Sequence, residues 1–119
     1  MMTIGQLSQK TGMTIRTIRY YEEKGIIIPD SHTQRGDRLF KEEHLNGILF
    51  IKYLRSAGLS IKEVQNYVDL LQKGSETRVQ RQILLSEVEK KILQDISEKQ
   101  KQLEHVRWKL ERYEDGFDC

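Results

Sequence analysis

Residues 4–25 read IGQLSQKTGMTIRTIRYYEEKG, and this stretch decides how the chain begins to fold. Its spacing predicts two short helices, with Gly12 as the conformationally permissive turn residue between them. Thr14 is a suitable N-cap for the second helix, because its hydroxyl can accept a backbone N–H of the first turn. In that helix Ile15, Ile18 and Tyr21 recur every three residues, so we expect this stripe to be buried.

Beside this stripe, the second helix carries polar groups that a core does not need. They are two arginines, a tyrosine and two nearby hydroxyls: Arg16, Arg19, Tyr20, Thr14 and Thr17. Such groups on one exposed helix face suit phosphates and base edges in a major groove. The stretch therefore predicts a helix-turn-helix in which residues 14–24 form the recognition helix. The alternative is an ordinary solvated face, and the short motif by itself leaves that open.

The next segment predicts a small hairpin, or wing. Residues 26–28 form a short apolar run that we expect to be a strand, and the apolar pair 39–40 returns after a polar loop. Arg35 and Arg38 flank the tip of this loop, where they could reach a backbone phosphate. An ordinary surface hairpin with solubilising arginines is the alternative.

Two further helices are predicted, over residues 41–57 and from Ser60 to about Lys73. Ser60 and Glu63 have the spacing of a capping box at the start of the second one. Both helices mainly supply a core, the first through the apolar residues Leu45, Ile48, Leu49, Tyr53 and Leu54. Arg55 and Lys62, near the junction, are candidates for phosphate contacts, although each alone is more often a surface charge.

Residues 77–113 contain neither proline nor glycine and predict one long helix. Its apolar residues follow a seam of mean spacing close to 3.5, interrupted near Lys99 and Gln100. The seam residues are Leu85, Val88, Ile92, Ile96, Leu103, Val106 and Leu110, with Tyr113 beyond them. We expect this seam to bury against the same helix of a second chain, in a parallel or antiparallel coiled coil. A solitary solvated helix is the alternative.

Composition bounds the function as well as the fold. The 119 residues suffice for one small domain with an extension, and the net charge is +2. Residues 1–74 hold 11 Lys and Arg against 8 Asp and Glu, so any basic surface belongs to the first part of the chain. No apolar run has membrane-spanning length and no signal peptide is recognisable, so we expect a cytoplasmic protein with no membrane partner.

Catalytic and metal chemistry find little support. The chain has no carboxylate pair, nucleophile–base arrangement or phosphate-cradling glycine loop, so we expect no enzyme and no cofactor. The histidines His32, His44 and His105 show no ligand spacing, and we expect no metal site. Cys119 is the single cysteine, which excludes an internal disulfide; a redox role and an incidental terminal thiol both remain open.

The chain resembles the MerR family of bacterial transcription regulators over essentially its whole length. The resemblance is carried by IGQLSQKTGMTIRTIRYYEEKGII at 4–27, RGDRLF at 35–40, IKYLRSAGLSIKEVQNYV at 51–68, and the long helix. It implies a winged helix-turn-helix, homodimerisation through an antiparallel coiled coil, and binding to pseudo-palindromic, double-stranded promoter DNA. It further implies that the protein bends and untwists the promoter spacer so that RNA polymerase can use both promoter elements.

Position by position, Arg19 and Tyr20 match the family's recognition-helix contacts, with Thr14, Arg16 and Thr17 as neighbours. Arg38 matches the wing arginine, and Arg55 matches an arginine that contacts the DNA backbone. One departure lies in the wing, where Asp37 replaces a common aromatic residue and is not expected to touch phosphates. The start of the long helix, residues 75–77, lacks the thiol of metal-sensing relatives. Residues 114–119 are too few to enclose a ligand pocket.

Together these observations predict a mainly α protein. We expect a winged helix-turn-helix DNA-binding domain in 1–74, a dimerisation helix in 75–113, and a short tail in 114–119. The expected function is a dimeric transcription regulator, and the small-molecule effector stays unassigned. A coiled-coil module that docks a protein without specific DNA binding is the alternative, which an exposed apolar patch in place of the arginine face would favour.

Overall fold

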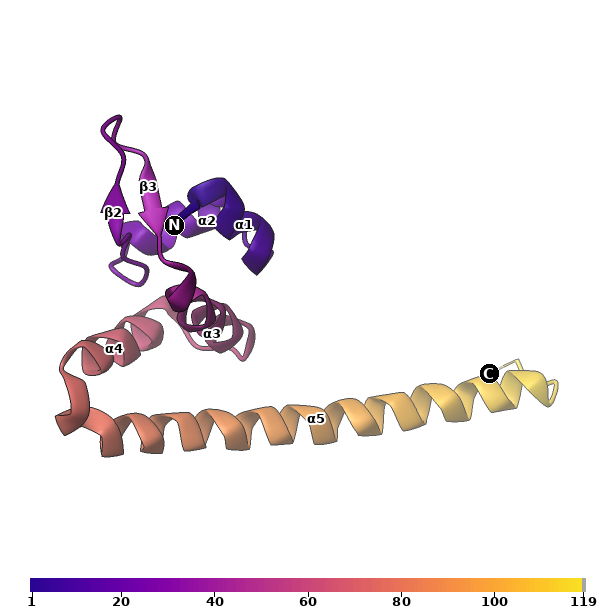
Figure 1. The fold of residues 1–119 in the computed structure, drawn as a ribbon. Helices are drawn as coiled ribbons and strands as arrows, with labels where there is room; N and C mark the ends of the chain where they lie inside the picture. The colour runs from indigo at the N-terminus through magenta and orange to yellow at the C-terminus, as the bar shows by residue number, and fades with distance from the viewer. Residues whose placement is uncertain (119) are drawn as a thin grey trace. The chain divides into compact units, whose positions relative to one another are not determined.

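The computed structural model describes residues 1–118, so the predictions for Cys119 lie outside the described residues. Short strands and helices make up the first part of the chain, and one long helix follows (Figure 1). In chain order the elements are β1 (Met2–Thr3), α1 (Ile4–Thr11), α2 (Ile15–Glu23), β2 (Ser31–His32), β3 (Arg38–Phe40), the 3₁₀ turn η1 (Glu42–His44), α3 (Leu45–Ser56), α4 (Ile61–Gln72), the 3₁₀ turn η2 (Gly74–Thr77) and α5 (Arg78–Glu114). The predicted mainly α fold, with a winged helix-turn-helix followed by a long helix, is confirmed.

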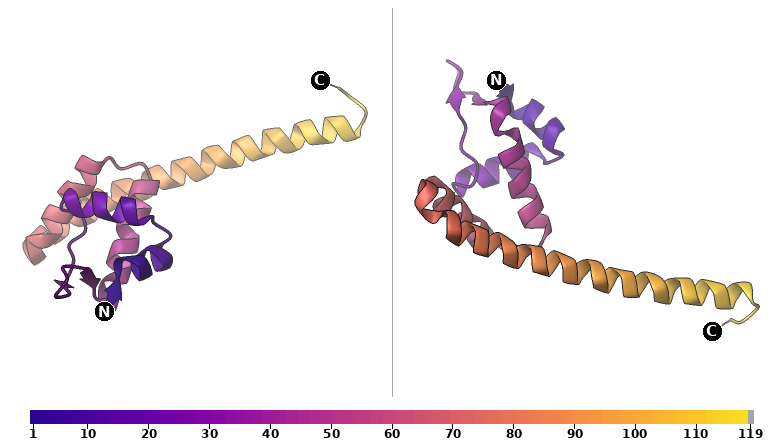
Figure 2. Two further views of the ribbon diagram at one scale, coloured as in Figure 1. Left: turned by 90° about the horizontal axis from the view of Figure 1, so that it is seen from above. Right: turned by 60° about the horizontal axis from the view of Figure 1, so that its bottom comes forward.

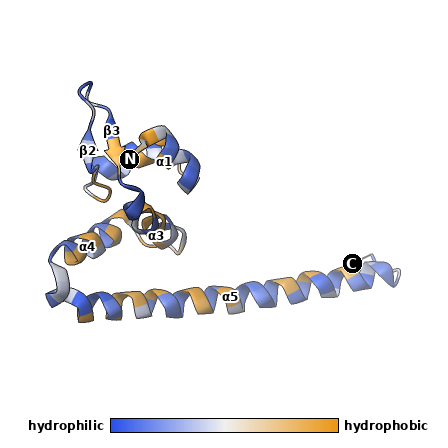
Figure 3. Cartoon of the chain, in the orientation of Figure 1, coloured by the Kyte–Doolittle hydropathy of each residue, from blue (hydrophilic) through white to orange (hydrophobic). Residues whose placement is uncertain are grey.

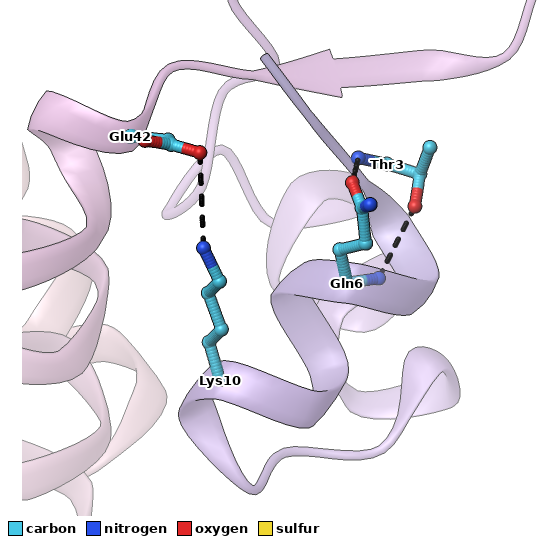
Figure 4. A network of polar contacts seen from close by, with 4 residues as sticks. All are labelled: Thr3, Gln6, Lys10 and Glu42. Atoms are coloured by element: carbon cyan, nitrogen blue, oxygen red, sulfur yellow. Dashed lines mark hydrogen bonds and ion pairs between the residues drawn. The ribbon is translucent and has the colours of Figure 1, made fainter.

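The two helices of the helix-turn-helix are delimited by local hydrogen bonds. Thr3 and Gln6 form a capping box at the start of α1, in which each side chain accepts the other residue's backbone N–H (Figure 4). Gly12 ends α1 with a φ of 73°, a conformation that favours glycine. The Thr14 hydroxyl accepts the Thr17 N–H at 3.1 Å and caps α2, as the sequence predicted.

Within the described residues, the wing belongs to a three-stranded antiparallel sheet with strand order β1-β3-β2. Met2 pairs with Phe40, and Ser31 pairs with Leu39. The strand predicted at residues 26–28 is wrong, because the chain there completes the C-terminal end of α2. The N–H groups of Ile26 and Ile27 both donate to the Tyr21 carbonyl, at 2.8 and 3.2 Å. The strand β1 was not predicted, because two residues are too few to show an alternating pattern.

The core of the N-terminal unit gathers around β3 and the helices beside it. Its most deeply buried side chains are Phe40, Met2, Leu7, Ile18 and Val64. The predicted α2 stripe holds for Ile18 and Tyr21 but is wrong for Ile15, which is 36% exposed. Ile15 is the first residue of α2, and Met13, in the turn before it, is buried in its place.

The helix predicted over 41–57 begins with the 3₁₀ turn η1 and becomes α-helical only at Leu45. The Asp30 carboxylate explains this start: it accepts the Lys41 N–H at 2.7 Å and lies 2.8 Å from His44 Nδ1. In α3 the buried face is Ile48, Ile51 and Leu54, whereas Tyr53, which was placed in the apolar stripe, is exposed. The chain turns at residues 57–60, and the predicted Ser60–Glu63 capping box begins α4.

The turn between α4 and α5 is held by side chains. Thr77 is 4% exposed, and its hydroxyl lies within hydrogen-bonding distance of the Leu70 and Gly74 carbonyls. Arg81 donates from Nε to this hydroxyl at 3.0 Å and from a terminal nitrogen to the Gly74 carbonyl at 2.9 Å. These contacts tie the end of α4, the turn η2 and the first turn of α5 to one another.

The chain divides into two compact units, Met1–Gln82 and the residues from Ile83 onward. The second unit consists largely of α5, a helix of 37 residues that runs without a break (Figure 2). Apolar turns recur along α5 between hydrophilic ones (Figure 3), and no residue of this helix is buried. The prediction of one long helix in this part of the chain is confirmed. The functional boundary expected between residues 74 and 75 stays a prediction.

None of the helices in residues 1–118 is long and apolar enough to span a membrane.

Candidate nucleic-acid interface

The exposed side of α2 is the centre of the candidate interface. Arg16, Arg19 and Tyr20 are all exposed, and their spacing of three and four residues places them on one face of the helix. Thr14 and Thr17 lie at the start of this helix, where the Thr14 hydroxyl donates to the Thr17 hydroxyl at 2.9 Å. The threonines therefore order the first turn, and the two arginines and the tyrosine offer charge, donors and an aromatic surface.

Tyr20 is held in an aromatic and cationic environment. Tyr20 is 42% exposed, and the centroid of its ring lies 6.0 Å from that of Tyr21 and 5.6 Å from the Lys24 ammonium. Lys24 lies four residues after Tyr20, as the C-cap residue of α2, and adds a cation that the sequence analysis did not single out. Helical spacing was the signal that could have found it. The pair places an aromatic ring and a positive charge close together at the end of the recognition helix.

The wing contributes two arginines in different settings. Arg35 is exposed in the loop between β2 and β3, which is closed by hydrogen bonds from the Asp37 and Gly36 N–H groups to Thr33. Arg38 lies at the base of the loop, within β3, and its Nε forms a close ion pair with the Glu22 carboxylate of α2. Arg38 thus joins the wing to the recognition helix, whereas Arg35 makes no such contact within residues 1–118.

The arginine predicted at the α3–α4 junction has a structural partner. Arg55 is half-buried, and one terminal nitrogen donates to the Leu59 carbonyl at 2.6 Å, which closes the turn between the helices. Its Nε is buried and, within the described residues, without a hydrogen-bond partner. Lys62 is exposed on the first turn of α4. Arg55 therefore closes the turn with one terminal N–H group, and only its other terminal N–H groups could serve a phosphate.

Two lysines that the sequence analysis passed over tie the helix-turn-helix to its support. Lys52 of α3 donates to the Thr11 carbonyl at 2.7 Å, so its ammonium occupies the C-terminal end of α1. Lys10 of α1 lies 3.8 Å from Glu42 of η1 in an exposed ion pair (Figure 4). The first contact is the stronger constraint, because it satisfies a helix-terminal carbonyl, whereas exposed ion pairs contribute little.

The described residues do not provide what a metal site requires. Within residues 1–118 no group of three His, Cys, Asp or Glu side chains lies close enough to hold a metal ion. The interface just described therefore consists of cations, hydroxyls and an aromatic ring on a helix and a wing.

Comparison with known proteins supports this interpretation of the fold. The family described as "MerR HTH family regulatory protein" matches residues 2–71. The HTH-type transcriptional regulator AdhR of Bacillus subtilis is 36% identical over 93 residues, which are 78% of this chain and 66% of AdhR, just under two thirds of its length. A ZntR homolog of Haemophilus influenzae, also an HTH-type transcriptional regulator, is 32% identical over 92% of this chain and 78% of its own.

Solved structures of the same family superpose on nearly the whole chain. A MerR-family transcriptional regulator from Bacillus thuringiensis superposes with a TM-score of 0.84 and 31% identity, over 94% of this chain and 98% of its own. HiNmlR, a MerR family regulator lacking the sensor domain and bound to promoter DNA, superposes with a TM-score of 0.85 over 95% of this chain and 90% of its own. Its 23% identity supports the shared fold alone. The chain therefore belongs to the MerR HTH family of regulatory proteins, as its resemblance predicted, and this is a family of transcription regulators and not of enzymes.

Proposed function

We propose that this protein binds pseudo-palindromic promoter DNA as a homodimer, with α2 in the major groove and the wing beside it. The observation that carries the proposal is the face of α2, where Arg16, Arg19 and Tyr20 are exposed together on a helix capped by Thr14. The relatives named as HTH-type transcriptional regulators and the DNA complex of HiNmlR support it. The proposed DNA-contacting residues are Thr14, Arg16, Thr17, Arg19, Tyr20, Arg35, Arg38, Arg55 and Lys62.

The proposal assigns DNA binding and dimerisation to different parts of the chain. Residues 1–74 would bind DNA, residues 75–113 would dimerise, and residues 114–119 would form a short tail. The exposed seam of α5 supports the second assignment, because a single chain cannot bury it: Ile92, Ile96 and Leu103 are 40, 55 and 43% exposed. A second copy of the same helix supplies a matching apolar surface. The proposed dimer contacts are Leu85, Val88, Ile92, Ile96, Leu103, Val106 and Leu110.

The spacing of the apolar seam residues supports antiparallel pairing of two α5 helices in one particular register. Its apolar positions are nearly symmetric about residues 97–98, so that Leu85 lies opposite Leu110 and Ile92 opposite Leu103 when one helix is reversed. A two-fold axis at this point relates the two DNA-binding units as the two halves of a pseudo-palindrome are related. Lys99 and Gln100, which interrupt the apolar pattern, then lie beside the two-fold axis.

The proposed effect on transcription is a change of DNA shape. A dimer that holds two half-sites on one duplex can bend and untwist the spacer, and the deformation energy depends on the protein conformation. RNA polymerase would then engage both promoter elements. The proposal includes this step because family members act in this way, and it assigns no effector.

A titration against duplex DNA from upstream of the protein's own gene tests the proposal. It is run at two salt concentrations, with a random duplex of equal length as competitor. We expect tight, salt-sensitive binding that survives the competitor. Binding no tighter than that of the random duplex would contradict operator recognition and would favour the alternative of a protein-docking module.

A further inference from the structure

The pairing of Arg38 with Glu22 separates the wing arginine from the other candidate contacts. Arg38 is the first residue of β3, and Glu22 is the second-last residue of α2. Their side chains are 33 and 22% exposed, whereas both partners of the Lys10–Glu42 pair and of the Lys41–Glu43 pair are at least 47% exposed. Water therefore screens the Arg38–Glu22 attraction less than it screens those two surface pairs.

The geometry of the pair leaves Arg38 able to contact a second anion. A guanidinium has five N–H donors, and the carboxylate of Glu22 engages the one on Nε. Because Nε lies at the stem side of the planar group, a bond there fixes the plane and leaves the terminal nitrogens for a phosphate. At the same time, the carboxylate offsets one positive charge at the edge of the interface.

We propose that Glu22 is a positioning residue for the wing contact, and that its charge suppresses sequence-independent attraction to DNA. The inference rests on the proposed function and deepens it. An unpaired Arg38 side chain could reorient to contact any nearby phosphate. When Glu22 holds the guanidinium in one plane, Arg38 contacts only a phosphate that lies in line with its terminal N–H groups. Glu22 thereby raises the ratio of specific to non-specific binding more than it raises affinity.

The variant Glu22→Gln removes the charge and keeps the shape and an oxygen acceptor. Glu23→Gln is the matched control, because Glu23 is the next residue of α2, is exposed, and loses the same charge. Each protein is titrated with the operator duplex and with a random duplex over a range of salt concentrations, after a thermal melt shows that it is folded.

For Glu22→Gln we expect random-duplex affinity to rise and the specific-to-random ratio to fall, by roughly threefold to tenfold, as one more cation becomes free for phosphates. The slope of log affinity against log salt on the random duplex should steepen by up to ~0.9. Glu23→Gln should shift both duplexes together and leave the ratio unchanged. In an Arg38→Gln background, Glu22→Gln should no longer change the ratio.

Equal ratios for Glu22→Gln and Glu23→Gln would overturn the inference, and so would an effect of Glu22→Gln that persists without Arg38. If Glu22→Gln does not fold, Arg38→Lys decides, because it keeps both charges but removes the guanidinium plane: the ratio should fall while the salt slope stays constant. A wild-type protein with no preference for the operator would refute the proposed function itself. A normal preference with equal variants would refute only the role of Glu22.

Discussion

The proposed dimer can be tested by placing charges in the α5 seam. The double variant Ile92→Lys/Val106→Lys puts two lysines on the face that the dimer would bury. The wild-type side chains are 40 and 57% exposed, so roughly half of each is left to bury on association. Since burying a whole Ile or Val contributes about 1.5–3 kcal/mol, half of it contributes about 1 kcal/mol.

The dimer contains four such side chains, because each helix contributes two. Their loss removes about 4 kcal/mol of association free energy, or about a thousandfold in the dimer dissociation constant. Any lysine that stayed in the seam would in addition be desolvated without a partner, which disfavours the dimer further. The lysines should therefore give monomers at concentrations where the wild-type protein is fully dimeric.

Sedimentation velocity over a range of protein concentrations measures this change directly. The control is Gln94→Lys/Ser97→Lys, which adds the same two charges at exposed positions on the opposite side of α5. The control should sediment as the wild-type protein does. A seam variant that stays dimeric with an unchanged dissociation constant would refute the coiled-coil assignment, and a control that dissociates as readily would show that net charge, not the seam, was responsible.

Three further sets of variants test separate parts of the molecule. Arg19→Ala should weaken operator binding by about 1–3 kcal/mol, measured by titration; wild-type affinity would remove Arg19 from the interface. Ser60→Ala removes the α4 cap and should lower the free energy of unfolding by about 0.5–2 kcal/mol in urea melts, whereas an unchanged midpoint would show that the capping box contributes nothing. In a Cys119→Ser background, a chain with both Ile92→Cys and Leu103→Cys should cross-link to its partner on oxidation. Ile92→Cys alone should not, because antiparallel helices place the two copies of this position ~16 Å apart along the axis; cross-linking of the single variant would instead show a parallel pair.

Local interactions account for what the sequence predicted well. The Ser60–Glu63 capping box, the Thr14 cap and the left-handed Gly12 are each formed within a few residues of the chain. Their geometry follows from residue type and spacing, and the structure confirms all three. The long helix was equally predictable, because 37 residues without a breaker leave few alternatives.

The sequence missed one local contact and one contact between distant residues. The apolar run at Ile26 and Ile27 is typical of a strand, but both N–H groups donate to the Tyr21 carbonyl at the end of α2. The ion pair of Arg38 joins residues 16 positions apart, and nothing in the local pattern around Glu22 marks it as the partner. The DNA-binding residues themselves stay predictions, because exposure on a helix permits a contact but does not demonstrate one.

The same reasoning explains why DNA binding and dimerisation are expected to depend on each other. The N-terminal unit buries its own core, but α5 leaves the seam exposed, so its apolar stabilisation is available only through association. In the proposed dimer one recognition helix would read one half-site, and a second one on the same duplex would bind at a high effective concentration once α5 links the two. A monomer, such as the seam variant would give, should therefore retain the arginine face of α2 and still lose most operator affinity. Its remaining binding should approach that for a random duplex.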